Sequence, residues 1–459
     1  MCEHVPLNRA KVVFATENDE NQSYKRLKMI VDITIENFRS LKAEQLFSFH
    51  VENPKSHLAS NVAYPMGDKI GVLRSAGIYG ANASGKSNVL LAFEALRYLV
   101  GQSGNLNEGE AIPCYEPYLL SEMTRNAPIR FEIEFIVPEG TRYSYTVMYN
   151  KSQILEETLD FYPSRQKANI FKRSFSDTWE TISFGGHYKG SVRRIPFFAN
   201  NGYLSKAGNS AASPDLIRNA YNYFRQHIRH VGSAEEIHIK DFFEEDGALA
   251  SAAELLCSVD TGISEVRSKL NKVNPETLKS FPDDLRDFIM EKTKRTFTFG
   301  HQTESGRIEF FKESMESEGT QRLFHATPML LTIFKTGGVL IWDEIDRSFH
   351  PNIAELLIRL FNDEMVNVGG AQLIFSTHNL QLMSPEQLRR DQIWFTTKED
   401  GQTSLYSLDS FDKNQVKSTT PYRDWYYDGR FGALPHVNYD RIASLLRPAM
   451  ARNRPEQLN

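Results

Sequence analysis

A glycine-rich loop between an apolar strand and an apolar helix constrains this chain most. Residues 80–87 read Gly-Ala-Asn-Ala-Ser-Gly-Lys-Ser, a full match to G-x-x-x-x-G-K-[ST]. Glycine lets the backbone wrap closely around a phosphate, and successive N–H groups at the start of a helix attract anions. Apolar residues 70–79 predict the strand that enters the loop, and residues 88–99 predict the helix that leaves it. The sequence therefore predicts an α/β protein with a phosphate-binding P-loop.

Each position of this loop has an expected role in binding a nucleotide. Lys86 is expected to reach the β- and γ-phosphates of ATP, and the Ser87 hydroxyl is expected to bind Mg²⁺. ATP and Mg²⁺ are thus the expected cofactors. The predicted nucleotide-binding residues are Gly80, Asn82, Ala83, Ser84, Gly85, Lys86, Ser87 and Asn88.

Composition sets the class of protein but not its partner. The chain has 459 residues, a net charge of −5 and three cysteines without C-x-x-C spacing. This favours a reducing cytoplasm over a disulfide-linked or zinc-bound protein. The apolar runs are shorter than the roughly 18 residues that a membrane span requires. We therefore expect a cytoplasmic protein with no membrane partner.

The N-terminal part predicts a tail followed by a hairpin. Residues 1–28 are polar, and we expect either a flexible extension or an upstream start with Met29 as the natural first residue. Alternation over residues 29–38 and the apolar residues of 45–51 predict two strands. Arg39, in the turn between them, is a candidate phosphate ligand; a surface arginine is an equally good interpretation.

Two later strands are expected to complete the nucleotide site. Val339-Leu-Ile-Trp ends in Asp343 and Glu344, and Gln372-Leu-Ile-Phe-Ser-Thr ends in His378. Side chains at the carboxyl ends of buried parallel strands line the sites of α/β proteins. We expect Asp343 to hold Mg²⁺, Glu344 to activate water, and His378 to hydrogen-bond the γ-phosphate.

A short motif before the predicted helix 321–334 points to a second subunit. Glu316-Ser-Glu-Gly-Thr320 resembles the signature of ATP-binding-cassette (ABC) ATPases. Ser317, Gly319, Thr320 and the helix N-terminus would bind the γ-phosphate held by another chain. The motif therefore predicts a homodimer, or a higher homo-oligomer, with ATP at its interface.

The segments between these motifs predict a β-layer and an inserted lobe. Residues 129–137, 143–149 and 154–161 read as antiparallel strands. Residues 160–230 hold eleven Lys and Arg against four acids, with aromatic residues between them. This stretch indicates either a DNA or partner surface, or a solvated β-layer with its aromatics turned inward. From 214 to about 295 the pattern predicts a compact helical lobe.

The expected organisation has five parts. We predict an ABC-type head whose N-terminal half (29–212) carries the P-loop and an antiparallel β-subdomain. A helical lobe (213–299) separates it from the C-terminal half (300–445). The extension 1–28 and a tail 446–459 flank these parts.

Taken together, the motifs resemble a family of bacterial stand-alone ATPases. Besides the sequences above, residues 427–435 (YDGRFGALP) support the resemblance. It is to RloA-like and AbiL-type abortive-infection ATPases, which are related to the ATPase part of OLD-family proteins and to the PARIS defence ATPase. The resemblance implies Asp346 as the D-loop residue. It also implies anti-phage defence together with a separately encoded effector, such as a TOPRIM-like nuclease.

Three functions compete on the sequence alone. The first is a slow, regulatory ATPase that switches a separate effector. The second is an ATPase of the SMC or repair type that acts directly on DNA. The third, a transporter motor, is disfavoured because 231 residues separate Lys86 from Ser317 and the usual L-S-G-G-Q is absent. Only about 80 residues follow His378, and their acids are scattered, so we expect no nuclease in this chain.

Overall fold

The computed structural model describes nine ranges of the chain: 27–52, 58–68, 70–189, 194–232, 247–259, 261–270, 295–417, 419–434 and 439–451. Most of the predicted extension 1–28 lies outside them. Its last two residues pack on the body. Leu27 is buried, and Lys28 Nζ donates to the Thr336 carbonyl over 2.6 Å. Leu27 and Lys28 therefore belong to the folded body, although the sequence predicts its boundary at Met29.

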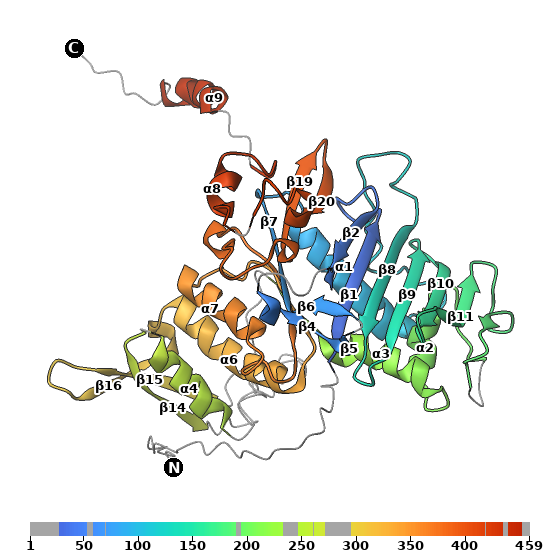
Figure 1. Ribbon diagram of the computed structural model, residues 1–459, viewed down its shortest axis with the longest axis horizontal. Helices are drawn as coiled ribbons and strands as arrows, with labels where there is room; N and C mark the ends of the chain where they lie inside the picture. The colour runs from blue at the N-terminus through green and yellow to red at the C-terminus, as the bar shows by residue number, and fades with distance from the viewer. Residues whose placement is uncertain are drawn as a thin grey trace, which may run out of the picture.

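A six-stranded sheet with one antiparallel edge forms the centre of the molecule (Figure 1). Its strands are buried apolar runs, which is typical of parallel sheets covered on both faces. In spatial order they are β13 (Ile228–Val231), β17 (Val339–Trp342), β18 (Gln372–Ser376), β7 (Ser75–Gly80), β19 (Ile393–Glu399) and β20 (Gln402–Ser407). All pair in parallel except β20, which is antiparallel to β19.

Successive residues of these strands belong to two separate cores. On β17, Val339 and Ile341 face one core, and Leu340 and Trp342 face the other, as the two-residue period of a strand requires. The first core contains α1 (Lys86–Gly101). The second contains α6 (Glu318–Thr336) and α7 (Pro351–Asn362). The sheet is therefore covered by helices on both faces.

A seven-stranded antiparallel sheet completes the α1 side, and it confirms the predicted β-subdomain. Its strands in spatial order are β12 (Ser183–Phe184), β11 (Ala168–Ser174), β10 (Ile154–Phe161), β9 (Arg142–Tyr149), β8 (Ile129–Ile136), β1 (Met29–Glu36) and β2 (Gln45–Ser48). Helices α2 (Tyr203–Gly208) and α3 (Asp215–His227) pack beside α1. The fold is the expected α/β architecture with an antiparallel β-subdomain.

The inserted lobe is not helical throughout, which corrects the prediction for residues 213–299. It contains α4 (Ala248–Ser258) and an antiparallel sheet of β14 (Ile263–Leu270), β15 (Arg295–Gln302) and β16 (Ile308–Lys312). Phe297 and Phe299 alternate with polar residues on β15, and this period of two favours a strand. The predicted helix at 283–290 lies outside the described residues, and α3 belongs to the head.

The remaining elements are short. A small sheet joins β3 (His50–Val51), β6 (Gly71–Leu73) and β4 (Val62–Ala63), and β5 (Pro65–Asp68) lies nearby in the chain. Near the C-terminus are α8 (Tyr422–Tyr427) and α9 (Tyr439–Ala451). The predicted tail 446–459 therefore begins within a helix, and 452–459 lie outside the described residues. In the described part of the chain, no helix has the length and apolar character to span a bilayer.

Candidate functional site

Gly80 and Gly85 of the P-loop occupy positions where a side chain would collide with neighbouring atoms. Gly85, directly before α1, has φ 113°, and a Cβ there would lie 2.2 Å from Thr403 Oγ1. A Cβ on Gly80 would lie 2.5 Å from the Thr396 carbonyl oxygen. Both contacts come from the β19–β20 hairpin, so this hairpin fits closely against the loop. The result is a cradle of backbone that a phosphate can approach.

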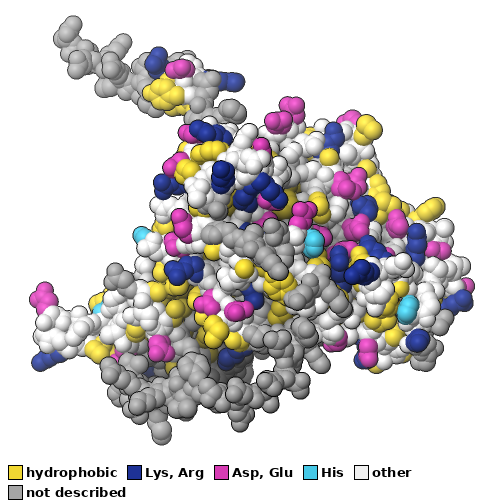
Figure 2. All heavy atoms as spheres, viewed as in Figure 1, with side chains coloured by type: hydrophobic (Ala, Val, Ile, Leu, Met, Phe, Trp, Pro, Cys, Tyr) yellow, Lys and Arg dark blue, Asp and Glu magenta, His cyan; other side chains and the backbone are white. Residues whose placement is uncertain are grey.

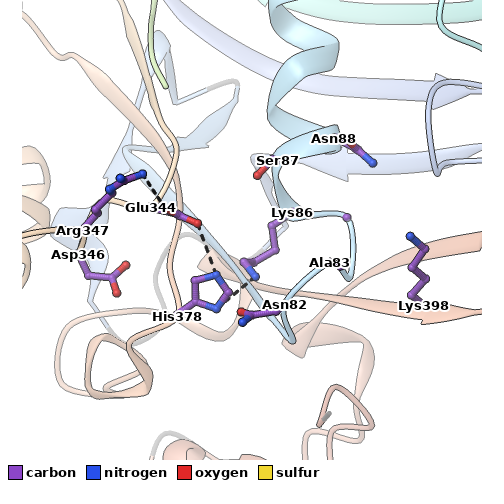
Figure 3. A pocket seen from close by; sticks show the side chains of 11 residues that line it. Asn82, Ala83, Lys86, Ser87, Asn88, Glu344, Asp346, Arg347, His378 and Lys398 are labelled. Atoms are coloured by element: carbon purple, nitrogen blue, oxygen red, sulfur yellow. Dashed lines mark hydrogen bonds and ion pairs between the residues drawn. The ribbon is translucent and has the colours of Figure 1, made fainter. Parts of the chain in front are cut away.

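The loop opens onto a cavity of about 720 Å³ (Figure 3). The cavity brings together residues that lie far apart in the sequence. Its lining includes nine of the predicted site residues: Asn82, Ala83, Gly85, Lys86, Ser87, Asn88, Glu344, Asp346 and His378. It also includes Arg347 and Lys398, which the sequence analysis did not identify.

Lys86 lies at the centre of this lining. Its Nζ donates to the carbonyl oxygens of Gly80 and Ala81 over 3.0 and 3.1 Å, and it lies 3.5 Å from His378 Nδ1. Burial lowers the pKa of Lys86 to about 8, although Asp343, Glu344 and Asp346 act in the opposite direction. The amine is thus partly desolvated, and phosphate oxygens are a natural counter-charge for it.

Glu344 extends into the cavity from the turn after β17. Its φ of 52° is left-handed, and its N–H donates to Ser376 Oγ over 2.8 Å. The Glu344 carboxylate lies between two basic side chains. It is 3.7 Å from His378 Nε2 and 3.9 Å from Arg347 Nη1 (Figure 3). The pKa of His378 is lowered, first by burial and then by the charge of Lys86. A carboxylate and an imidazole therefore face each other beside the P-loop lysine.

Asp343 and Asp346 are held by the neighbouring strand. Asp343 is buried and accepts from Ser376 Oγ over 2.5 Å, and Asp346 accepts from Thr377 Oγ1 over 2.6 Å. Asp343 does not line the cavity, whereas the Ser87 hydroxyl does. Carboxylate and hydroxyl oxygens, completed by phosphate oxygens, suit the hard Mg²⁺ ion. Among the described residues no group of three or more His, Cys, Asp or Glu could bind a metal unaided.

Among the predicted nucleotide-binding residues, three lie outside the cavity lining. Gly80 and Ser84 lie against β19 rather than in the lining. Ser84 Oγ is 2.6 Å from Thr396 Oγ1. Arg39 has φ 53°, forms an ion pair with Glu116 at 2.5 Å and lies 3.5 Å from Asn88 Oδ1. The Arg39 guanidinium is thus compensated by a carboxylate at the edge of the site, and its role as a phosphate ligand stays a prediction.

The ESEGT motif lies at the N-terminus of α6, as expected, and does not line the cavity. Ser317 Oγ accepts from the Thr320 N–H over 3.1 Å and so caps the helix. A Cβ on Gly319 would lie 2.3 Å from the Ser348 carbonyl oxygen, so a glycine is needed where the motif meets the turn after Glu344. Ser317 is exposed. The motif is therefore available to another molecule.

Comparisons with known proteins agree with this arrangement. A family model described as "AAA domain, putative AbiEii toxin, Type IV TA system" matches residues 75–384, which is more than half of the chain. The matched residues run from the P-loop strand past His378. The chain belongs to this AAA domain family. The finer resemblance to RloA-like and AbiL-type ATPases stays a prediction, and no curated protein matches the chain.

Solved structures resemble this AAA domain protein only distantly. The SMC head domain from Thermotoga maritima is 14% identical, with a TM-score of 0.39, and the match covers 82% of this chain and 98% of that one. A structure of the recombination mediator RecF with ATP is 13% identical, with a TM-score of 0.34, over 83% and 99%. Similarities this weak support no functional argument.

Part of the basic charge in stretch 160–230 of this AAA domain protein is compensated by acids from neighbouring strands. Arg173 is buried beside Glu157, and Lys172 pairs with Glu156. Lys167 lies within 4 Å of Glu132 and Glu134, at 3.7 and 3.6 Å. Most of the aromatic residues point inward, and three, Phe175, Trp179 and Phe198, are exposed. Over strands β8 to β11, basic and acidic side chains are interspersed (Figure 2). This part of the stretch thus fits the solvated β-layer.

Arg347 and Lys398 could not be found by motif. Arg347 lies in the turn after β17, and the sequence does not predict the conformation of that turn. Lys398 lies in β19, and the residues around it match no known motif. The available signal was positional. Arg347 follows β17, and Lys398 lies at the carboxyl end of β19. Both strands are parallel to β7, so their carboxyl ends lie at the same edge of the sheet as the P-loop.

Proposed function

We propose that this chain is an ATP-dependent switch that pairs with a second copy of itself around ATP. ATP would bind with Mg²⁺ in the cavity, and slow hydrolysis would end the paired state. In the paired state the protein would control a separately encoded, nuclease-like effector in anti-phage defence. No separate function of binding DNA is proposed, because Lys167, Lys172 and Arg173 of the basic stretch pair with acids and most of its aromatic residues are buried.

One observation carries this proposal. Lys86, Glu344 and His378 meet around one cavity, while Ser317 caps a helix outside it and is exposed. The cavity therefore has a phosphate cradle and a candidate base, but it lacks the positive helix end that the ESEGT motif offers. A second copy would supply that end, and the exposed Ser317 fits such a contact.

The side chains of the cavity have distinct proposed roles. Lys86 would neutralise the β- and γ-phosphates, and Ser87 with Asp343 would hold Mg²⁺, which supplies further neutralising charge when bound. Glu344 would accept the proton of the attacking water, with His378 orienting the γ-phosphate. Asp346, fixed by Thr377, would keep the turn before Ser348 in place against the motif.

The link to defence rests on the family. The family is described by a toxin of type IV toxin–antitoxin systems. Among the described residues there is no acidic cluster that could hold the metal ions of a nuclease. A destructive activity would then reside in a partner, which favours a switch over a self-contained toxin.

The variant Glu344→Gln tests the proposal. It should retain ATP binding but lose ATP hydrolysis by at least a hundred-fold, because an amide cannot accept the proton from water. The matched control is Glu309→Gln, an exposed glutamate on β16, which should hydrolyse ATP at the rate of the unchanged protein. The measurement is phosphate release with Mg²⁺ present.

The same variant also identifies the partner. Tagged Glu344→Gln should retain one co-encoded protein from cells when ATP is present, and lose it when Lys86 is also changed to Ala. Recovery of DNA without such a protein would instead support direct action on DNA. Unchanged phosphate release by Glu344→Gln would contradict the assignment of Glu344 as the base that accepts the proton from water.

A further inference from the structure

The cavity has two ends, and only one is explained by the roles above. Glu344, Asp346, Arg347 and His378 lie at one end, and Lys398 stands alone at the other, beyond the P-loop (Figure 3). The order of strands produces this separation. The strands β17 and β18, which precede Glu344 and His378, lie on one side of β7, and β19, which carries Lys398, lies on the other.

We propose that Lys398 binds the α-phosphate, the phosphate next to the sugar, of both ATP and ADP. This inference rests on the proposed nucleotide function of the cavity. Because Glu344 and His378 mark the γ-phosphate end, a linear triphosphate held by Lys86 must run away from them. Its α-phosphate and nucleoside then lie toward β19.

The hairpin places Lys398 on the correct face. Side chains two residues apart on a strand point the same way, so Lys398 shares a face with Thr396. Thr396 Oγ1 contacts Ser84 Oγ at 2.6 Å. The cross-strand neighbour of Lys398 is Thr403, whose hydroxyl donates to the Ser84 carbonyl over 2.8 Å. Two residues of that face therefore touch the P-loop, and Lys398 extends the face toward the open cavity.

The hairpin is also anchored independently of any ligand. The Thr403 N–H donates to the Ser40 carbonyl over 2.7 Å, and Thr403 Oγ1 contacts Ser40 Oγ at 2.7 Å. Tyr118 donates its hydroxyl to the Asp400 carbonyl over 3.1 Å. The backbone that carries Lys398 is thus fixed relative to the loop, so little ordering is needed when a ligand binds.

Lys398 has no ion pair or hydrogen bond recorded with another described residue, and its side chain is exposed. This differs from Arg347, which lies beside Glu344, and from Arg39, which pairs with Glu116. An ammonium group at the edge of a phosphate cavity is a suitable partner for a phosphate oxygen.

Equilibrium binding of ATP and of ADP to Lys398→Ala tests this inference. Both affinities should fall by the same factor, about ten-fold, which corresponds to one charge-assisted contact at a partly exposed site. The ATP concentration that gives half-maximal hydrolysis should rise by a similar factor, because the proposed contact is made when ATP binds. Lys398→Arg should restore most of the affinity, and the control Lys151→Ala, in an exposed turn, should change nothing.

Two results would overturn the inference. Unchanged affinity of Lys398→Ala for both nucleotides would show a solvated surface lysine. Loss of ATP affinity alone would place Lys398 at the γ-phosphate. Failure of the proposed function looks different: the unchanged protein would then bind no ATP, or Glu344→Gln would hydrolyse it normally.

Discussion

The Lys86 ammonium donates to two carbonyl oxygens and is buried. We expect its protonation to make nucleotide binding depend on pH. Burial lowers the pKa of Lys86 to about 8. Phosphate charges favour the ammonium form, so bound ATP should raise this pKa. Below pH 8 the lysine already carries its proton, and the affinity for ATP should be constant. Above pH 8 binding must take up a proton, and the affinity should fall about ten-fold per pH unit.

Titration of ATP binding from pH 7 to 9.5 at constant ionic strength measures this slope. His378→Gln provides the control, because the pKa of His378 is lowered and its ring is neutral throughout this range. That variant should show a weaker affinity with the same slope. A constant affinity for ATP up to pH 9.5 would contradict the assigned role of Lys86.

Single residues were predictable where a motif fixes the spacing. The glycines, Lys86 and Ser87 follow from one pattern, and Glu344 and His378 follow from strands that end in polar residues. Arg39 shows the limit of this reasoning. Its compensation by Glu116 depends on a loop 77 residues away in the chain, which local patterns do not report.

Among the elements, β10 carries a buried charge whose loss has a measurable cost. The Glu157 carboxylate is fully buried and accepts the N–H groups of Tyr203 and Leu204 over 2.6 and 2.8 Å, at the start of α2. Arg173 Nη1 lies 3.7 Å away. Burial raises the pKa of Glu157, and Arg173 opposes this shift. The pair therefore joins the antiparallel sheet to the helices beside α1.

Glu157→Ala should lower the free energy of unfolding by about 3–5 kcal/mol, because it leaves Arg173 buried without its counter-charge. The neighbouring Glu156 pairs with Lys172 at the surface, so Glu156→Ala should cost about 1 kcal/mol or less. Denaturant unfolding of the two variants gives both values. Equal losses of stability would show that the buried pair has no special role.

The strands of the head were predictable because buried parallel strands are continuous apolar runs and half-exposed strands alternate. The inserted lobe was not. Ile263 to Leu270 mixes charged and apolar residues, and its pairing with β15 crosses more than 20 residues of chain. Local sequence patterns report such non-local pairing only weakly. The helical pattern of α4 therefore led to the prediction of a helical lobe.

For the whole molecule, the central claim is that one chain supplies only half of each ATP site. The cavity holds the P-loop half, and Ser317 at the exposed end of α6 would complete the site of a neighbour. The sequence suggested this because residues 316–320 resemble the signature of ABC ATPases, which with the helix N-terminus would bind a γ-phosphate held by another chain. Sequence could not show where the motif lies relative to the P-loop.

The mass of Glu344→Gln in solution, measured by light scattering with and without ATP and Mg²⁺, tests this claim most directly. The account predicts a single chain of 52.5 kDa without ATP and twice that mass with it. Adding Ser317→Arg to this variant should keep ATP bound at the chain's own P-loop but prevent pairing. A single-chain mass for Glu344→Gln with ATP bound, or pairing that Ser317→Arg does not affect, would contradict it.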